Sequence, residues 1–137
     1  MSWVVDSSFV CSLFLPDEKS TGVEAIFSDA LDSSLKAPIL LKYEVANAVR
    51  SAVRRGRITS AVAMEILPLF LDLPIEYDPL DNTSRASRIL ELALDHDLSV
   101  YDATYLELAL HTNSGLLALD RKLQEICRQK DVPVIDE

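Results

Sequence analysis

Short apolar runs alternate with longer segments of helical periodicity along the chain. Runs that fit buried strands cover residues 3–5, 36–37, 74–77, 116–119 and 132–135. Apolar residues recur every three or four positions in six segments, which are residues 7–15, 19–31, 41–55, 60–71, 102–111 and 122–130. A further helix is predicted to end near residue 95 and to have Asp81 or Thr83 as its N-cap. Short apolar strands separated by helices predict an α/β fold, a central parallel sheet with helices on both faces.

Two of the predicted strands end in an aspartate and lead into a helix. Val4-Val5 is followed by Asp6, and the run at residues 116–119 is followed by Asp120. Sites in open parallel sheets lie outside the carboxyl ends of the strands, so both carboxylates belong to the edge where a site is expected. Each aspartate is equally well explained as a helix N-cap, a role that Asp favours.

Two more acids lie on predicted helices near this edge. Glu44 falls at the border of the apolar stripe of helix 41–55, on the same side as Asn47 and Ser51, and a partly buried Glu that reaches water is the alternative interpretation. Asp102 starts helix 102–111 on the face of Leu106, which directs it toward the sheet, and an N-cap is again the alternative.

Four carboxylates gathered at one edge repel one another unless a cation lies among them. We expect no lysine within the segments that carry these acids to offset the negative charge of the carboxylates. Carboxylate oxygens as ligands favour Mg²⁺ or Mn²⁺ over zinc. His96 and His111 have no metal-binding spacing and are expected at the surface. Cys11 and Cys127 are far apart and are expected as reduced core residues.

Length and charge limit the number of domains and the ways in which the chain can bind nucleic acid. A chain of 137 residues fits one domain, residues 1–137, and it has neither a signal-peptide pattern nor an apolar run long enough to span a membrane. The net charge of -9 argues against binding nucleic acid by phosphate neutralisation alone.

Basic residues nevertheless cluster at Arg50, Arg54, Arg55 and Arg57. They either complement the helix dipole or form a track for phosphates or an acidic partner.

Four segments that contain the acids resemble PIN domains, and most of all the ribonuclease toxins of VapBC-type toxin–antitoxin pairs. They read Val-Val-Asp-Ser-Ser at residues 4–8, Tyr-Glu-Val-Ala-Asn at 43–47, Ser-Val-Tyr-Asp-Ala-Thr-Tyr-Leu-Glu-Leu-Ala at 99–109 and Leu-Asp-Arg-Lys-Leu at 119–123. The resemblance covers essentially the whole chain in order, spacing and length. It departs at Ala118, where many relatives carry Thr or Ser two residues before the last aspartate.

The resemblance implies a PIN-like three-layer fold, an acidic pocket for Mg²⁺ or Mn²⁺, and endonucleolytic cleavage of RNA in the cytoplasm. It makes Asp6, Asp102 and Asp120 the direct metal ligands, while Glu44 holds a second metal ion or orients water. It further implies a homodimer and a small antitoxin that blocks the site.

Ser7, Asn47 and Arg50 are candidates for positioning the substrate, although Ser7 is equally a first-turn helix residue. A non-catalytic scaffold with the same fold is the alternative function, and retention of four mutually repelling acids favours the enzyme. A phospho-accepting receiver domain is excluded, because such a domain has an acidic pair after its first strand and a lysine near the end of its sheet.

Overall fold

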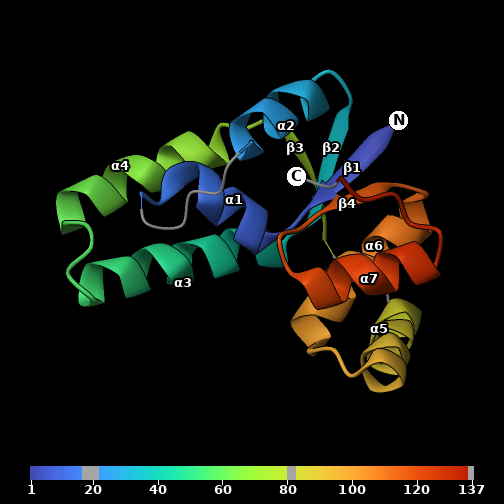
Figure 1. Cartoon of the computed structure of the whole chain (residues 1–137). Helices are drawn as coiled ribbons and strands as arrows, with labels where there is room; N and C mark the ends of the chain where they lie inside the picture. The colour runs from blue at the N-terminus through green and yellow to red at the C-terminus, as the bar shows by residue number, and fades with distance from the viewer. Residues whose placement is uncertain (17–21, 80–82, 136–137) are drawn as a thin grey trace.

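Figure 1 shows a computed structural model of the chain, which describes residues 1–16, 22–79 and 83–135. Its centre is a four-stranded, wholly parallel sheet in the order β3-β2-β1-β4. The strands are β1 (Ser2–Val5), β2 (Ser34–Pro38), β3 (Ile75–Asp78) and β4 (Gly115–Leu117). The parallel sheet predicted from the alternating pattern is confirmed.

The strand order reverses at β1, and this creates the point where a site is expected. From β1 the chain first builds outward through β2 to β3 and then returns to place β4 on the other side of β1. The register pairs Val5 with Leu117, so β1 and β4 end side by side. In open parallel sheets the crevice at such a reversal is the usual ligand site.

Helices cover both faces of the sheet, as Figure 1 shows. One face carries α1 (Ser7–Phe14), α2 (Val23–Ala30), α3 (Leu40–Arg54) and α4 (Ser60–Leu71). The other carries α5 (Thr83–His96), α6 (Val100–Thr112) and α7 (Arg121–Gln129). Because parallel strands need crossover connections, reversing the strand order transfers the later helices to the opposite face.

Burial of both sheet faces explains why the strands are apolar without alternation. Val4 and Val5 of β1 point to opposite faces, and both side chains are inaccessible to solvent. Gly115 opens β4 where the Trp3 ring packs directly against its backbone, so a Cβ atom at residue 115 would collide with that ring. The close approach of β1 and β4 therefore depends on glycine at this position.

Some predicted boundaries differ from the structure. The last strand, predicted at residues 132–135, is reduced to a single parallel bridge between Leu116 and Val134. Pro133 supplies a carbonyl to Leu116 but has no amide hydrogen, so a regular ladder cannot continue through it. The helix predicted from residue 19 is described from Val23, and residues 17–21 lie outside the described ranges. The side-chain cap predicted at Asp81 or Thr83 also lies outside what the structure describes.

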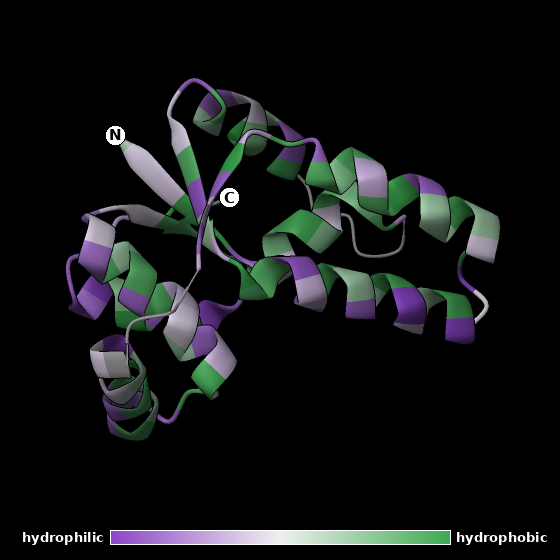
Figure 2. Ribbon diagram, turned by 180° about the vertical axis from the view of Figure 1, so that it is seen from behind, coloured by the Kyte–Doolittle hydropathy of each residue, from purple (hydrophilic) through white to green (hydrophobic). Residues whose placement is uncertain are grey.

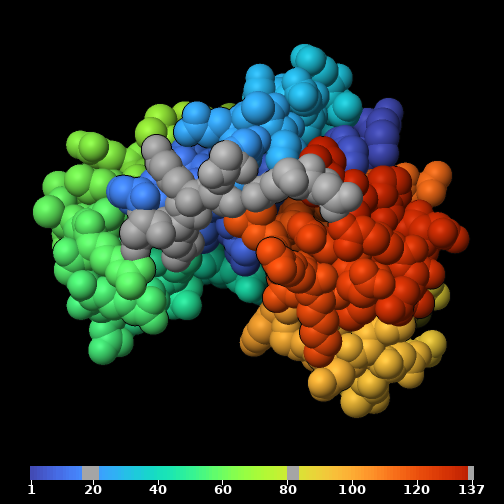
Figure 3. Space-filling model, viewed as in Figure 1, coloured from blue at the N-terminus to red at the C-terminus, as the bar shows by residue number. Residues whose placement is uncertain are grey.

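In space-filling view the α3–α4 pair projects away from the lobe formed by α5, α6 and α7, and a notch separates them on the side of α3 (Figure 3). Within the described ranges, no helix has the length and apolar character needed to cross a bilayer.

Candidate active site

Asp6 is a buried carboxylate that caps α1. Only 4% of its surface is exposed, and its Oδ1 accepts hydrogen bonds from the Phe9 amide at 2.9 Å and the Ser8 hydroxyl at 2.8 Å. The N-cap interpretation is therefore correct, and it does not exclude a second role. Burial raises the pKa of Asp6 to about 7, with smaller contributions from the charges of Asp102 and Glu44, and the two hydrogen bonds oppose this rise.

Glu44 projects from the first turns of α3 and is half-buried. The Tyr105 hydroxyl donates a hydrogen bond of 2.5 Å to its Oε1 from α6, on the opposite face of the sheet. Burial raises the pKa of Glu44, repulsion from Asp102 adds to the rise, and the bond from Tyr105 opposes it. This carboxylate is thus held in place by a helix from the other layer.

Asp102 does not cap α6. The helix begins at Val100, and its cap is Ser99, whose hydroxyl accepts a hydrogen bond from the Asp102 amide at 3.0 Å. The prediction that the helix starts at Asp102, and its N-cap alternative, are therefore wrong: the carboxylate lies in the first turn, where negative charge is favourable. Burial raises the pKa of Asp102 first and the charge of Asp120 second, while Ser99 and Lys122 oppose the rise.

Asp120 caps α7, and its Oδ1 accepts a hydrogen bond from the Leu123 amide at 2.9 Å. It is exposed, unlike Asp6, and its charge acts on Asp102. Lys122 also acts on Asp102, so the expectation that no lysine within these motifs offsets the acids is wrong for that one carboxylate. Repulsion links all four acids through Asp102, which interacts with Asp6, Glu44 and Asp120.

A hollow of about 270 Å³ adjoins Glu44. Its lining residues come from α1 and α3, and they are Ser7, Ser8, Cys11, Glu44, Asn47 and Ala48. Two of the three residues predicted to position substrate, Ser7 and Asn47, are therefore next to Glu44. The third, Arg50, is exposed on α3 and does not line this hollow.

Two residues that hold the acids in place were not singled out in the sequence. Tyr105 holds Glu44, and its spacing of three residues from Asp102 on one helix face is the signal that points to it. Ser8 donates to Asp6 and accepts a hydrogen bond of 3.3 Å from the Leu119 amide, which joins the ends of β1 and β4.

The chemistry of the four acids fits a hard divalent cation, because the donors are carboxylate oxygens whose charges oppose one another. In the described part of the chain, however, no three His, Cys, Asp or Glu side chains lie close enough to hold an ion together. Mg²⁺ commonly keeps several waters and binds through one or two carboxylates, so a cluster of three protein ligands is not required for it.

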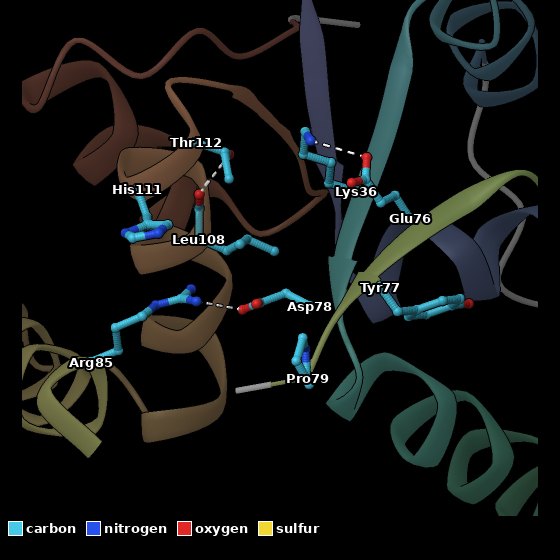
Figure 4. A pocket seen from close by; sticks show the side chains of 9 residues that line it. All are labelled: Lys36, Glu76, Tyr77, Asp78, Pro79, Arg85, Leu108, His111 and Thr112. Atoms are coloured by element: carbon cyan, nitrogen blue, oxygen red, sulfur yellow. Dashed lines mark hydrogen bonds and ion pairs between the residues drawn. The ribbon is translucent and has the colours of Figure 1, made fainter. Parts of the chain in front are cut away.

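A second hollow, of about 320 Å³, lies away from the acids between β3, α5 and α6 (Figure 4). Arg85 contacts Asp78 at 2.8 Å and makes two bonds of 2.8 Å to Glu107, so its guanidinium joins all three elements. His111 borders this hollow and is exposed as predicted, whereas His96 is half-buried. The charges that line this hollow are engaged with one another, which indicates a structural role.

Neither Cys11 nor Cys127 is in a disulfide, and both are buried, as predicted. Burial raises the pKa of the Cys127 thiol to about 12, and the charge of Asp6 adds to this rise. A thiol that stays protonated at neutral pH is a poor nucleophile. Cys127 is therefore not a candidate nucleophile.

Comparison with known proteins places this arrangement in a family. The family model described as "PIN domain" matches residues 3–129. The chain belongs to the PIN-domain family. Ribonuclease VapC3 of Pyrobaculum aerophilum is 35% identical to this PIN domain over 128 residues, which are 91% of this chain and 94% of the relative. The resemblance to VapC-type proteins found in the sequence is confirmed.

Solved structures agree with this assignment. PAE2754 from Pyrobaculum aerophilum matches with a TM-score of 0.67 and 25% identity over 91% of this PIN domain and 86% of that chain. Mycobacterium tuberculosis VapC20, described as a sarcin–ricin loop cleaving toxin, matches with a TM-score of 0.68 and 14% identity over 90% of this chain and 94% of its own. The second likeness concerns the fold alone.

Proposed function

We propose that this protein is an endoribonuclease that acts as the toxin of a toxin–antitoxin pair. The observation that carries the proposal is the gathering of Asp6, Glu44, Asp102 and Asp120 around the reversal point of a PIN-domain sheet. The 35% identity to Ribonuclease VapC3 supports the same activity. The raised pKa of three of these acids supports the proposal, because functional sites commonly hold acids in environments that disfavour their charge.

Asp6, Asp102 and Asp120 are the residues we assign to Mg²⁺ or Mn²⁺. When bound, such an ion neutralises charge on a phosphate and makes water a better nucleophile near neutral pH. These three side chains would bind the ion through carboxylate oxygens, which hard divalent cations prefer.

Glu44 is our candidate for acting on the attacking water. Its carboxylate is anchored by Tyr105 and faces the hollow lined by Ser7 and Asn47. We assign to Glu44 the orientation of the water that attacks phosphorus. As the new P–O bond forms, the bridging ribose oxygen on the opposite side of phosphorus departs, and the proton lost by the water is balanced by the proton that this oxygen takes up from solvent. The Ser7 hydroxyl and the Asn47 amide are suited to hydrogen-bond the RNA backbone beside it. Arg50 remains a sequence-based candidate for the same task.

The partners follow from the same proposal. RNA is the substrate, a small antitoxin covers the acidic site with a basic side chain, and two copies of the chain associate in the cytoplasm. Exposed apolar side chains support association with other proteins. On α4 they are Val62, Met64, Leu69 and Leu71, and near α5 and α6 they are Leu90, Leu94, Val100 and Tyr101.

Cleavage of RNA by the purified protein tests the activity. Wild-type protein should cut structured RNA in Mg²⁺ or Mn²⁺ and stop when a chelator is added. Asp6→Asn should abolish cleavage while it keeps the α1 cap, because Asn caps a helix about as well as Asp. A melting curve for this variant shows that the fold is intact. Cleavage that persists in chelator or in Asp6→Asn contradicts the mechanism.

A further inference from the structure

One flank of α3 connects the acidic site to a pair of arginines. At about 100° per residue, Glu44, Asn47, Ser51, Arg54 and Arg55 fall within about 100° of arc, beside the buried stripe of the helix. The hollow at Glu44 and Asn47 is followed along the helix by a second hollow of about 330 Å³, lined by Ser51, Arg54 and Arg55. The flank is therefore hollowed at both ends.

The charge along this flank changes sign with distance from the site. Glu44 is the last acid before Glu65, so the rest of α3 and the turn after it carry only positive charge. Figure 2 shows the far end of α3 as strongly hydrophilic beside a largely hydrophobic α4. Neither Arg54 nor Arg55 forms an ion pair with any residue that the structure describes, and both are exposed.

We propose that Arg54 and Arg55 form a phosphate-binding subsite for single-stranded RNA, which runs along α3 from Glu44. The proposal rests on the endoribonuclease function and adds where the strand lies. The ten residues from Glu44 to Arg54 rise about 15 Å, so the arginines bind phosphates a few nucleotides from the one being cut. Guanidinium groups bind phosphate oxygens through paired hydrogen bonds.

This arrangement accounts for RNA binding by a chain whose net charge is -9. The negative charge is concentrated where a cation is proposed, and the strand is held by positive charge at the other end of the helix. The helix dipole alone favours a cation in the last turn of α3. It does not account for two arginines on the flank that carries Glu44 and Asn47, next to a hollow without a charged partner among the described residues.

Binding of RNA by charge-reversed variants tests the subsite. The variants Arg54→Glu/Arg55→Glu are made in an Asp6→Asn background, so that a short fluorescein-labelled single-stranded RNA is bound without being cut. Arg88→Glu on α5 is the control, because Arg88 is an exposed arginine on the opposite face of the sheet. Binding is measured over a range of salt concentrations in Mg²⁺.

We expect the double variant to bind the RNA more weakly, whatever its base sequence, and Arg88→Glu to change binding little. The slope of log affinity against log salt should become shallower by about 1.4, since each lost phosphate contact on a single strand contributes about 0.7. In the otherwise wild-type protein, the same double variant should raise KM more than it lowers kcat.

Equal affinity and equal salt slopes for the double variant and its parent overturn the subsite, whereas failure of the wild type to cut any RNA overturns the endoribonuclease function instead. If the double variant cuts RNA normally but no longer co-purifies with the protein encoded beside it, the arginines bind an acidic protein and the subsite is again overturned.

Discussion

Tyr105 shows how a single residue in the core sets the properties of the candidate site. Its hydroxyl donates to Glu44 across the sheet, its side chain is buried, and the charge of Asp6 acts on it. Burial and the neighbouring carboxylates raise the pKa of the phenol above its ordinary value of 10, so the hydroxyl stays protonated near neutral pH and can donate. The bond therefore stabilises the ionised form of Glu44 specifically.

Replacing Tyr105 by Phe should move the pH dependence of cleavage. Without the bond the pKa of Glu44 rises further, so the acidic limb of the pH–rate profile should shift to higher pH. Loss of one buried hydrogen bond should lower the free energy of unfolding by about 1 kcal/mol. The profile is measured with saturating Mg²⁺ for the wild type and the variant.

Tyr101→Phe is the matched control, because Tyr101 lies on the same helix and is 59% exposed. We expect its profile to equal that of the wild type. A Tyr105→Phe profile that coincides with both would show that ionised Glu44 is not required for cleavage.

At the scale of elements, the docking of α5 depends on a buried ion cluster rather than on apolar contact alone. Glu107 is fully buried on α6, and Arg85 reaches it from α5 while it also contacts Asp78 at the end of β3. A buried carboxylate is strongly disfavoured without a partner. The pairing therefore fixes which part of α5 meets α6.

Removing one partner should cost far more stability than removing both. Arg85→Met leaves Glu107 buried without its cation and should lower the free energy of unfolding by roughly 3–5 kcal/mol. Arg85→Met combined with Glu107→Leu should recover most of that loss, because the pair becomes apolar. Urea unfolding of the two variants and the wild type measures both changes.

Arg88→Met on the same helix is the control, because that side chain is exposed and its substitution should have little effect. If the Arg85→Met/Glu107→Leu double variant is no more stable than Arg85→Met, the idea that Arg85 stabilises the fold by neutralising buried Glu107 is contradicted.

On the scale of the whole molecule, the acidic edge opposes folding. The pKa of Asp6 is about 7 in the folded protein against an ordinary value of 3.8, so the folded state retains a proton that the unfolded state releases. The wild type should therefore lose stability as the pH rises from about 4 to about 7. A bound cation offsets this loss because it binds only the folded chain.

Asp6→Asn should remove this pH dependence without losing the cap. In chelator above pH 7 it should be more stable than the wild type by roughly 4 kcal/mol, since the pKa rises by about three units and each unit is worth about 1.4 kcal/mol, and the two should converge near pH 4. Mg²⁺ should stabilise the wild type and affect the variant much less. Melting curves across pH, with chelator and with Mg²⁺, measure both effects.

The exposed Asp29→Asn substitution on α2 serves as the charge-matched control, and its curve should parallel that of the wild type. Asp6→Asn and wild-type curves that stay parallel in chelator and respond equally to Mg²⁺ would remove Asp6 from the cation site.

The sequence by itself determined the features that depend on local order. Apolar runs and helical periodicity indicated the parallel sheet and most helices, because burial on both faces imposes those patterns on neighbouring residues. The same order placed Asp6 and Asp120 after strands, and the spacing of the acids indicated the family. That residues 1–137 form one domain remains a prediction.

Only the tertiary structure decided the contacts between distant residues. Tyr105 and Glu44 are 61 positions apart and meet because their helices approach one edge of the sheet from opposite faces. Ser99 rather than Asp102 caps α6, since cap geometry depends on where the chain turns into the helix. The last strand is reduced to one bridge because it depends on pairing with Leu116, and Pro133 limits that pairing.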